Sequence, residues 1–267
     1  MAMDISDRPA VLGMQKASFE TAQGVTLLNN ISVTFRAGCL TAIVGHNGSG
    51  KSTALKMLAG LNKPTSGSVT LDGNDVEQFS AREFAKSVAY LAQDPGHGAD
   101  YTVEELIALG RYPWHGPFGR LREHDKQAIE RAILLTGLGP LRKRAVNTLS
   151  GGERQRAWIA VTLAQQAPCL LLDEPISALD LSHQYEILLL LEQLCKQDGL
   201  CIIAVLHDIN LASRFADQIV ALKGGHLIAD APPSTIMQSD MLRTIFGMDM
   251  LVHPHPAHGH PIALANV

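Results

Sequence analysis

One stretch of the chain has the residue types and the spacing needed to bind phosphate. It runs from Gly45 to Thr53 and reads GHNGSGKST. Its glycines lack a Cβ atom, so the backbone can curl and direct its N–H groups at an anion. The spacing G-x-x-x-x-G-K-S places Lys51 to reach the β- and γ-phosphates of a nucleotide and the Ser52 hydroxyl to ligate Mg²⁺. The predicted nucleotide-binding residues of this loop are Gly45, Asn47, Gly48, Ser49, Gly50, Lys51, Ser52 and Thr53.

The sequence on either side of the loop predicts the elements that must hold it. Leu40–Val44 is a short apolar run, typical of a buried strand, and residues 54–59 are good helix formers with no breaker before Gly60. A helix that begins at the loop adds a partial positive charge and unpaired N–H donors. The alternative is a glycine-rich turn that matches by chance, which average glycine usage makes roughly a one-in-a-hundred event. We therefore interpret the loop as a nucleotide site.

Polar side chains follow two further apolar runs. Residues 169–172 and 201–206 are continuously apolar, as strands of a parallel sheet covered on both faces must be. Asp173 and Glu174 follow the first run, and His207 follows the second. Ligands bind at the carboxyl ends of strands in a doubly wound sheet, so we expect these groups at the same edge as the phosphate loop.

The remaining pattern predicts a helical insertion in an α/β core. Strands are expected at residues 15–21, 31–35, 68–71 and 88–91 and in a hairpin at 219–228. The pattern turns helical at Thr102, which forms a capping box with Glu105. Gly110 is expected to end this helix, residues 112–119 contain too many breakers for a helix, and a second helix begins at Asp125. Residues 95–160 therefore resemble an inserted helical subdomain.

Three segments leave alternatives open. Phe19, in a strand-like segment upstream of the loop, either stacks on an adenine ring or is an ordinary core residue. The segment from Tyr112 to Phe118 holds three aromatic side chains that need a partner surface, with a core role for Trp114 as the alternative. The tail from Val252 onward carries four histidines among prolines. Such a tract can bind metal, and a proline-interrupted terminus is more often simply mobile.

Composition and charge exclude several classes of protein. The 267 residues are 46% hydrophobic and 18% charged, as in a globular chain with ample material for a core. A net charge of −4 gives no basic footprint, so nucleic acid is not expected as a partner. The N-terminus does not read as a secretory signal, and no apolar run approaches the ~18 residues of a membrane-spanning helix. Four scattered cysteines favour buried free thiols and a reducing, cytosolic compartment.

A second glycine-containing motif narrows the class of nucleotide-binding protein. Residues 149–158 read LSGGERQRAW and resemble the signature sequence of ABC (ATP-binding cassette) ATPases. At a helix start, Ser150, Gly151 and Gly152 would form a second anion cradle. Glu153 stands where the family more often has glutamine, a change that keeps size and reach. Two copies pack head to tail in this family, so the resemblance implies that each ATP lies between the phosphate loop of one chain and the signature helix of another.

The other motifs of the family are present in the expected order. Gln93 resembles the Q-loop glutamine, which contacts Mg²⁺ or the attacking water, and Asp173 resembles the Walker B aspartate that positions Mg²⁺. Glu174 resembles the general base, and His207 resembles the switch histidine that hydrogen-bonds the γ-phosphate. The resemblance therefore implies catalytic roles for Glu174, His207, Gln93 and Lys51, and Mg²⁺ ligation by Ser52, Gln93 and Asp173.

The segment after Glu174 contains one further family motif and one residue that differs from the family pattern. Residues 177–180 resemble the D-loop that links the two ATP sites, and Asp180 is its expected nucleotide-site residue. Ile176 stands where a small polar residue is usual after Glu-Pro, which affects local packing rather than chemistry. With the family in place, Phe19 becomes the candidate for adenine stacking.

Residues 110–116, 149–160 and 204–210 are similar to the ATPase of ferric-hydroxamate siderophore importers. This resemblance implies ATP and Mg²⁺ as cofactors, a second copy of the chain and an integral-membrane permease as partners, and a periplasmic binding protein acting through the permease. It also implies a peripheral location at the cytoplasmic face of a bacterial inner membrane, with residues 112–118 where the permease docks. The wider group serves ferric citrate, catecholate siderophores, haem and cobalamin, and no residue of this chain selects among these cargoes.

The resulting expectation is an α/β fold with a P-loop NTPase core of the ABC ATPase kind. A mixed β-sheet with flanking helices is joined by an inserted α-helical subdomain and an N-terminal antiparallel β region. One domain is expected over residues 10–267, with the core at 10–94 and 161–230, the helical signature subdomain at 95–160 and a C-terminal extension at 231–267. A soluble ABC ATPase of DNA repair or translation would need a coiled-coil insertion or tandem cassettes, and a P-loop kinase has no use for a second anion cradle.

Overall fold

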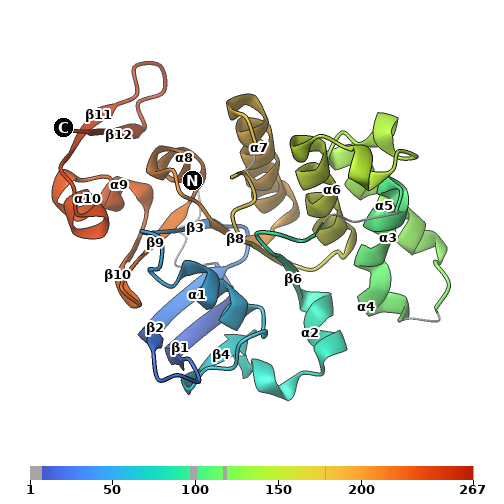
Figure 1. Cartoon of the computed structure of the whole chain (residues 1–267), viewed down its shortest axis with the longest axis horizontal. Helices are drawn as coiled ribbons and strands as arrows, with labels where there is room; N and C mark the ends of the chain where they lie inside the picture. The colour runs from blue at the N-terminus through green and yellow to red at the C-terminus, as the bar shows by residue number, and fades with distance from the viewer. Residues whose placement is uncertain (1–7, 97–100, 117–118, 178, 267) are drawn as a thin grey trace. The chain divides into compact units, whose positions relative to one another are not determined.

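The computed structural model describes residues 8–96, 101–116, 119–177 and 179–266 (Figure 1). The chain divides into two compact units, residues 1–78 with 191–267 and residues 79–190. The fold is α/β, as the sequence predicts, and each unit contains both helices and strands.

The first unit begins with an antiparallel sheet in the order β2-β1-β4-β5. Strand β1 (Ala10–Glu20) lies between β2 (Thr26–Arg36) and β4 (Ser66–Leu71), and the short β5 (Asn74–Asp75) follows at the edge. Buried and exposed side chains alternate along the second half of β2, from Ile31 to Phe35. This alternation confirms the predicted half-buried strand and the predicted N-terminal antiparallel region.

The same unit contains the strands that carry the phosphate loop. Strand β3 (Leu40–Val44) is fully buried and pairs in parallel with β8 (Cys201–Val205) and β9 (Gln218–Lys223), while β10 (His226–Ala231) runs antiparallel to β9. Helix α1 (Lys51–Leu58) follows β3, and α8 (Ile209–Phe215) follows β8. The parallel pairs are those that the apolar runs predict, and the antiparallel pair is the expected hairpin.

The C-terminal part of the first unit forms regular secondary structure. After α9 (Pro233–Ile236) and α10 (Ser239–Phe246), strands β11 (Met250–Pro254) and β12 (Pro261–Ala265) form a hairpin (Figure 1). The Asn210 amide of α8 exchanges two hydrogen bonds with the backbone of Ala263, at 3.1 and 2.7 Å. These bonds hold the hairpin, a long-range constraint that the local proline pattern does not reveal.

The histidines of this hairpin stack instead of converging on a point. The rings of His255, His258 and His260 lie nearly parallel, with centroids 4.7 to 6.2 Å apart. Among the described residues, no group of three or more His, Cys, Asp or Glu side chains is arranged to hold a metal ion.

The second unit is mostly helical. Helix α2 (Ala81–Ser87) leads into β6 (Val88–Leu91), which pairs in parallel with β7 (Cys169–Leu172). Between them lie α3 (Val103–Ala108), α4 (Tyr112–His115), α5 (Glu123–Leu135) and α6 (Gly151–Ala164), and α7 (Leu181–Asp198) follows β7. Single 3₁₀ turns at Leu109–Arg111, Gly139–Leu141 and Val146–Thr148 connect the helices.

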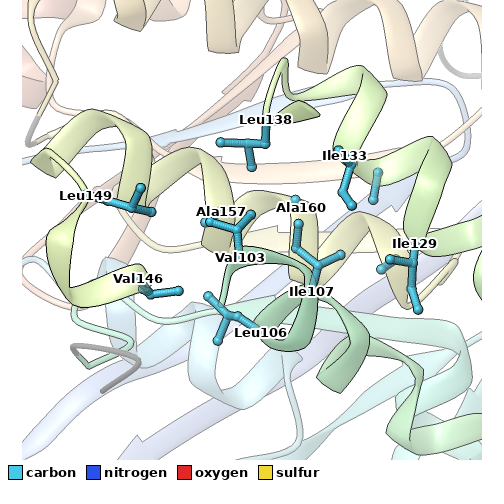
Figure 2. Packing of buried hydrophobic residues seen from close by; sticks show 12 residues of the cluster. Val103, Leu106, Ile107, Ile129, Ile133, Leu138, Val146, Leu149, Ala157 and Ala160 are labelled. Atoms are coloured by element: carbon cyan, nitrogen blue, oxygen red, sulfur yellow. The ribbon is translucent and has the colours of Figure 1, made fainter. Parts of the chain in front are cut away.

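A continuous apolar cluster holds the helices of this unit together. Side chains of α3, α5 and α6 point toward one another in Figure 2, with Ile107, Ile133 and Ala160 buried at its centre. The cluster fixes the signature helix α6 against α3 and α5. The Thr102–Glu105 capping box at the start of α3 is present as predicted, with Thr102 N–H donating to the Glu105 carboxylate at 2.8 Å.

The predicted loop after α3 is partly helical, which corrects the sequence analysis. Tyr112–His115 is a helical turn, because Pro113 lies at its start, where no backbone N–H is required. Helix α3 ends at Ala108, and Gly110 lies in the following 3₁₀ turn, where a Cβ atom would sit 2.2 Å from the Val161 carbonyl oxygen. Phe118 lies outside the described residues.

The described helices include none with both the length and the apolar character that a membrane crossing requires.

Candidate nucleotide-binding site

The phosphate loop has a backbone that only glycine can adopt at key points. Gly45, Gly48 and Gly50 have φ angles of 145°, 76° and 101°. A Cβ atom on Gly45 would lie 2.1 Å from the Leu222 carbonyl oxygen, and one on Gly50 would lie 2.6 Å from the Leu28 side chain. The loop is therefore pressed against its neighbours with its exposed tip, at Asn47 and Gly48, turned to solvent.

Lys51 and the start of α1 have the chemistry that suits an anion. Lys51 is 6% exposed, and its ammonium donates to the carbonyl oxygens of Gly45 and His46, both at 2.9 Å. No side chain caps α1 at Gly50, and its first turn holds no acidic residue. Helix starts carry N–H groups without intrahelical partners, so this end of α1 suits a phosphate.

Hydroxyl groups at the same place suit a nucleotide with its metal ion. Ser52 and Thr53 are half-buried in the first turn of α1. The Ser49 side chain is 3% exposed, and its hydroxyl has no hydrogen-bond partner within the described part of the chain. An orphaned buried hydroxyl inside a glycine cradle fits a ligand-binding loop.

His207 and Phe19 belong to the same unit as the loop. Strand β8 pairs with β3, with Val205 opposite Ile43, so His207 emerges exposed at the strand end that carries the loop. Phe19 is half-buried on β1 and pairs across the strands with Leu28, the residue that packs against Gly50. The structure thus brings both residues to the phosphate-loop end of this unit.

The second unit presents two carboxyl groups at the end of β7. Asp173 is 2% exposed, its N–H donates to the Leu91 carbonyl oxygen at 2.9 Å, and the Tyr90 hydroxyl lies 3.5 Å from its Oδ2. Burial, together with the Asp173 carboxylate, raises the pKa of Tyr90 to about 12, so its hydroxyl stays protonated and can donate. The sequence analysis does not identify Tyr90 as a site residue. The available signal is its place near the end of β6, the strand that pairs with β7 and so lies beside Asp173.

Glu174 has an unusual backbone for a residue with a side chain. Its φ is 54°, in the left-handed region, and its side chain is half-buried. The Ser177 hydroxyl donates to the Glu174 carbonyl oxygen at 3.1 Å and helps hold this turn. Such strain in a non-glycine residue is characteristic of functional positions. Gln93 follows β6 and is exposed on the same unit.

The segment after Glu174 explains two sequence features. Ile176 is buried, at 7% exposed, so this departure from the family pattern serves packing. Asp180 accepts hydrogen bonds from the backbone N–H and side chain of His183, at 3.0 and 2.7 Å. The backbone N–H of His183 lowers the pKa of the Asp180 carboxyl, so its charge is engaged locally at the start of α7. Ala178, part of the predicted D-loop, lies outside the described residues.

The signature segment forms the start of α6. Ser150 is the N-cap, and its hydroxyl accepts from the Glu153 N–H at 3.3 Å while the Glu153 carboxylate accepts from the Ser150 N–H at 2.8 Å. Gly151 is exposed and has open space where a Cβ atom would stand. Gly152 lies against Leu179, with 3.4 Å to a Cβ atom built on it. Signature and D-loop thus touch within this unit.

The predicted residues therefore fall into two groups. The first unit carries the phosphate loop, His207 and Phe19, and the second carries Gln93, Asp173, Glu174, the signature residues and Asp180. The residues of both groups lie on or next to the strands and helices that the sequence predicts for them.

Comparison with known proteins defines the class. Residues 28–177 match the family model described as ABC transporter. The chain belongs to the ABC transporter family, and it is an ABC ATPase.

Three relatives show the extent of the similarity. The ferric enterobactin transport ATP-binding protein FepC of Escherichia coli (strain K12) is 41% identical over 90% of this chain and 88% of its own. The hemin import ATP-binding protein HmuV of Rhodopseudomonas palustris (strain HaA2) is 41% identical over 95% and 96%. The iron(3+)-hydroxamate import ATP-binding protein FhuC of Bacillus subtilis (strain 168) is 39% identical over 89% and 88%.

Solved structures agree with the fold. The chain of cbiO1 from Clostridium perfringens, part of the ABC transporter complex cbiONQ, has a TM-score of 0.78 at 26% identity, covering 88% of this chain and 94% of that one. A dimeric post-hydrolysis state of the ATP-binding cassette MJ0796, bound to ADP and Pi, has a TM-score of 0.70 at 27% identity, covering 83% and 98%.

Proposed function

We propose that this chain is the ATP-hydrolysing subunit of a bacterial ABC importer and energises uptake of a ferric-hydroxamate siderophore. The observation that carries the ATPase part is the phosphate loop, where Lys51 is buried against two loop carbonyls and α1 starts without a side-chain cap. A lysine and an uncapped helix start at one loop are the features that bind the phosphates of a nucleoside triphosphate in this class of site.

The proposed roles follow from the chemistry of each side chain. Glu174 acts as general base toward the attacking water, and His207 stabilises charge on the γ-phosphate. Ser52, Gln93 and Asp173 would hold Mg²⁺, which neutralises phosphate charge when bound. Lys51 contacts the β- and γ-phosphates, Phe19 stacks on the adenine, and the remaining loop residues bind phosphate.

The proposed active form is a head-to-tail dimer. Ser150, Gly151, Gly152, Glu153 and Asp180 of each copy would face the nucleotide held by the phosphate loop of the other. The relative MJ0796, which forms a dimer with ADP and Pi, supports this arrangement. ATP binding would close the dimer and hydrolysis would reopen it, which is coupling through the different affinities of two states for nucleotide.

We further propose the boundaries and location that the sequence predicts. The core comprises residues 10–94 and 161–230, the signature subdomain 95–160, and the extension 231–267. The chain would bind a permease at the cytoplasmic face of the inner membrane, with residues 112–118 at the docking surface. A periplasmic binding protein would act on it only through the permease.

The relatives do not agree on one cargo. Relatives of similar identity are named for ferric enterobactin, hemin and iron(3+)-hydroxamate import. Ferric hydroxamate is our choice from the sequence resemblance, with catecholate siderophore, haem, ferric citrate and cobalamin as the alternatives. The ATPase touches nucleotide and permease, so its own residues do not select the cargo.

The test is ATP hydrolysis by the chain co-purified with its permease in lipid. Binding protein loaded with ferric hydroxamate is added, and then with haem, ferric enterobactin, ferric citrate and cobalamin. Stimulation by ferric hydroxamate alone, abolished in Glu174→Gln, is expected. Stimulation by another ligand would replace the cargo, and hydrolysis indifferent to every ligand and to the permease would favour a soluble, non-transport ABC ATPase.

A further inference from the structure

His46 is the phosphate-loop residue to which neither the motif nor the family resemblance gives a role. In the structure, its Nε2 atom lies 2.6 Å from the carbonyl oxygen of Phe246, the last residue of α10. A carbonyl oxygen only accepts, so Nε2 is the donor. The two rings also meet edge to face, with centroids 5.8 Å apart and planes at 75°. The C-terminal extension thus contacts the loop directly.

The end of α10 is suited to this contact. The last carbonyl groups of a helix have no intrahelical partner and carry partial negative charge. Thr244 O accepts from the Lys223 ammonium at 2.5 Å, and Phe246 O accepts from His46. Leu242 and Ile245 of α10 are fully buried, so packing fixes the position of the helix.

Strand β9 connects the two contacts. Its residue Leu222 presents the carbonyl oxygen that a Cβ atom on Gly45 would strike, and Lys223 beside it binds α10. In the turn that follows β9, the Gly225 N–H donates to the Ser49 carbonyl oxygen at 3.2 Å. The loop, the end of β9 and the end of α10 therefore form one connected set of contacts in the first unit.

We propose that α10 is a positioning element for the phosphate loop, acting through Phe246 on His46 to raise the affinity for nucleotide. The Lys51 ammonium, which the phosphates need, is shared with the His46 carbonyl oxygen. Anchoring the His46 side chain to α10 fixes where that carbonyl points and so where the lysine rests. A released side chain lets the loop relax around the ammonium. His46 is a positioning residue here, and the inference rests on the proposed nucleotide site.

Linkage makes the effect reciprocal. If the contact between α10 and the phosphate loop raises the affinity for ATP, bound ATP must stabilise that contact by the same factor. The C-terminal extension would then report the nucleotide state of the loop, although it lies some 200 positions along the chain from it.

The test compares ATP affinity and turnover in full-length variants. His46→Ala removes the donor and the ring, and we expect the Kd for ATP to rise about fivefold while kcat at saturating ATP stays within about twofold. His46→Gln, which keeps an N–H donor, should recover part of the affinity. Phe246→Ala keeps the carbonyl oxygen and loses only the ring contact, so about a twofold rise is expected.

Arg243→Ala is the matched control on the same helix, because its guanidinium pairs with Asp249 at 2.9 Å on the exposed side. We expect wild-type affinity for it. Hydrogen exchange gives the reciprocal readout: ATP should slow the amides at the end of α10 in the wild type and not in His46→Ala.

Wild-type ATP affinity in His46→Ala would overturn the proposal, and so would an equal loss in Arg243→Ala. Failure of the wild-type chain to bind ATP at all would instead contradict the proposed function, and it would appear in every variant alike.

Discussion

The starts of α1 and α6 are both predicted anion cradles, yet they are built in opposite ways. Helix α1 begins after Gly50, which has a left-handed backbone, no capping side chain and no acidic residue in the first turn after it. Helix α6 begins after Ser150, which forms a reciprocal capping box with Glu153. One helix start has no side-chain cap, and the other is capped by its own side chains.

The difference indicates what each cradle can do alone. The start of α1, with Lys51 beside it, can bind phosphate within one chain. At α6 the Glu153 carboxylate is held by the Ser150 N–H, which lowers its pKa, so a negative charge sits where an anion would approach. The signature cradle therefore needs a phosphate already held and charge-compensated by another group, as in the proposed dimer.

The largest expected effect comes from removing the cation of the first cradle. Lys51→Ala should reduce ATP hydrolysis at least about 100-fold, because the loop loses the charge that faces the phosphates. Phosphate release at saturating ATP measures it. Lys56→Ala, on the exposed face of the same helix, is the control and should hydrolyse normally. Near-normal turnover in Lys51→Ala would refute the role of α1.

Alanine substitutions of one glycine at each helix start are expected to have different effects. Gly50→Ala forces a side chain into φ 101° and within 2.6 Å of Leu28, so nucleotide affinity should fall about tenfold and stability by about 1–3 kcal/mol. Gly151→Ala meets open space, so the free energy of unfolding should change by less than about 0.5 kcal/mol. ATP titration and thermal unfolding measure both. Equal destabilisation by the two would contradict the contrast.

Glu153→Gln removes the negative charge at the start of α6 and keeps the shape of the side chain. We expect ATP-dependent dimerisation to tighten about threefold, since a like charge leaves the second cradle. Because the folded pKa of Glu153 lies below its ordinary value of 4.5, its stabilisation is present above about pH 4.5 and is lost as pH falls through the lowered pKa. The variant should lack this part of the acid dependence in thermal unfolding. An identical acid profile in both proteins would show that the charge of Glu153 contributes nothing to stability.

The smallest expected effect concerns the group beside Asp173. Tyr90→Phe removes a donor 3.5 Å from Oδ2, a long hydrogen bond, so the Mg²⁺ concentration for half-maximal hydrolysis should shift by less than about twofold. A tenfold shift would mean that Tyr90 positions the aspartate. Titration of hydrolysis with Mg²⁺ distinguishes the two.

Local signals predicted much of the fold. The fully apolar runs gave β3, β7 and β8 nearly to the residue, because a strand buried on both faces has no polar positions. The capping box predicted the start of α3, because its hydrogen bonds join residues only three positions apart. For Tyr112–His115 the breakers predict a loop, whereas Pro113 lies at a helix start, where proline is compatible with a helix.

Long-range contacts could not be read from the sequence. The bond from Asn210 to the C-terminal hairpin and the contact of His46 with Phe246 join segments far apart in the chain. At the site, the motifs gave the residue types and their elements. The positive φ of Glu174 depends on backbone geometry and appears only in the structure. The self-capping of α6 follows the same Ser/Thr-x-x-Glu pattern as the start of α3 and could have been predicted from the sequence.

The most direct test of the two-cradle account is the oligomeric state of Glu174→Gln with ATP and Mg²⁺, measured by sedimentation. The account predicts monomer without ATP and dimer with it. It also predicts that adding Ser150→Arg abolishes the dimer while the monomer still binds ATP through the first cradle, because the arginine blocks only the second cradle. A dimer that persists in the double variant would contradict the account.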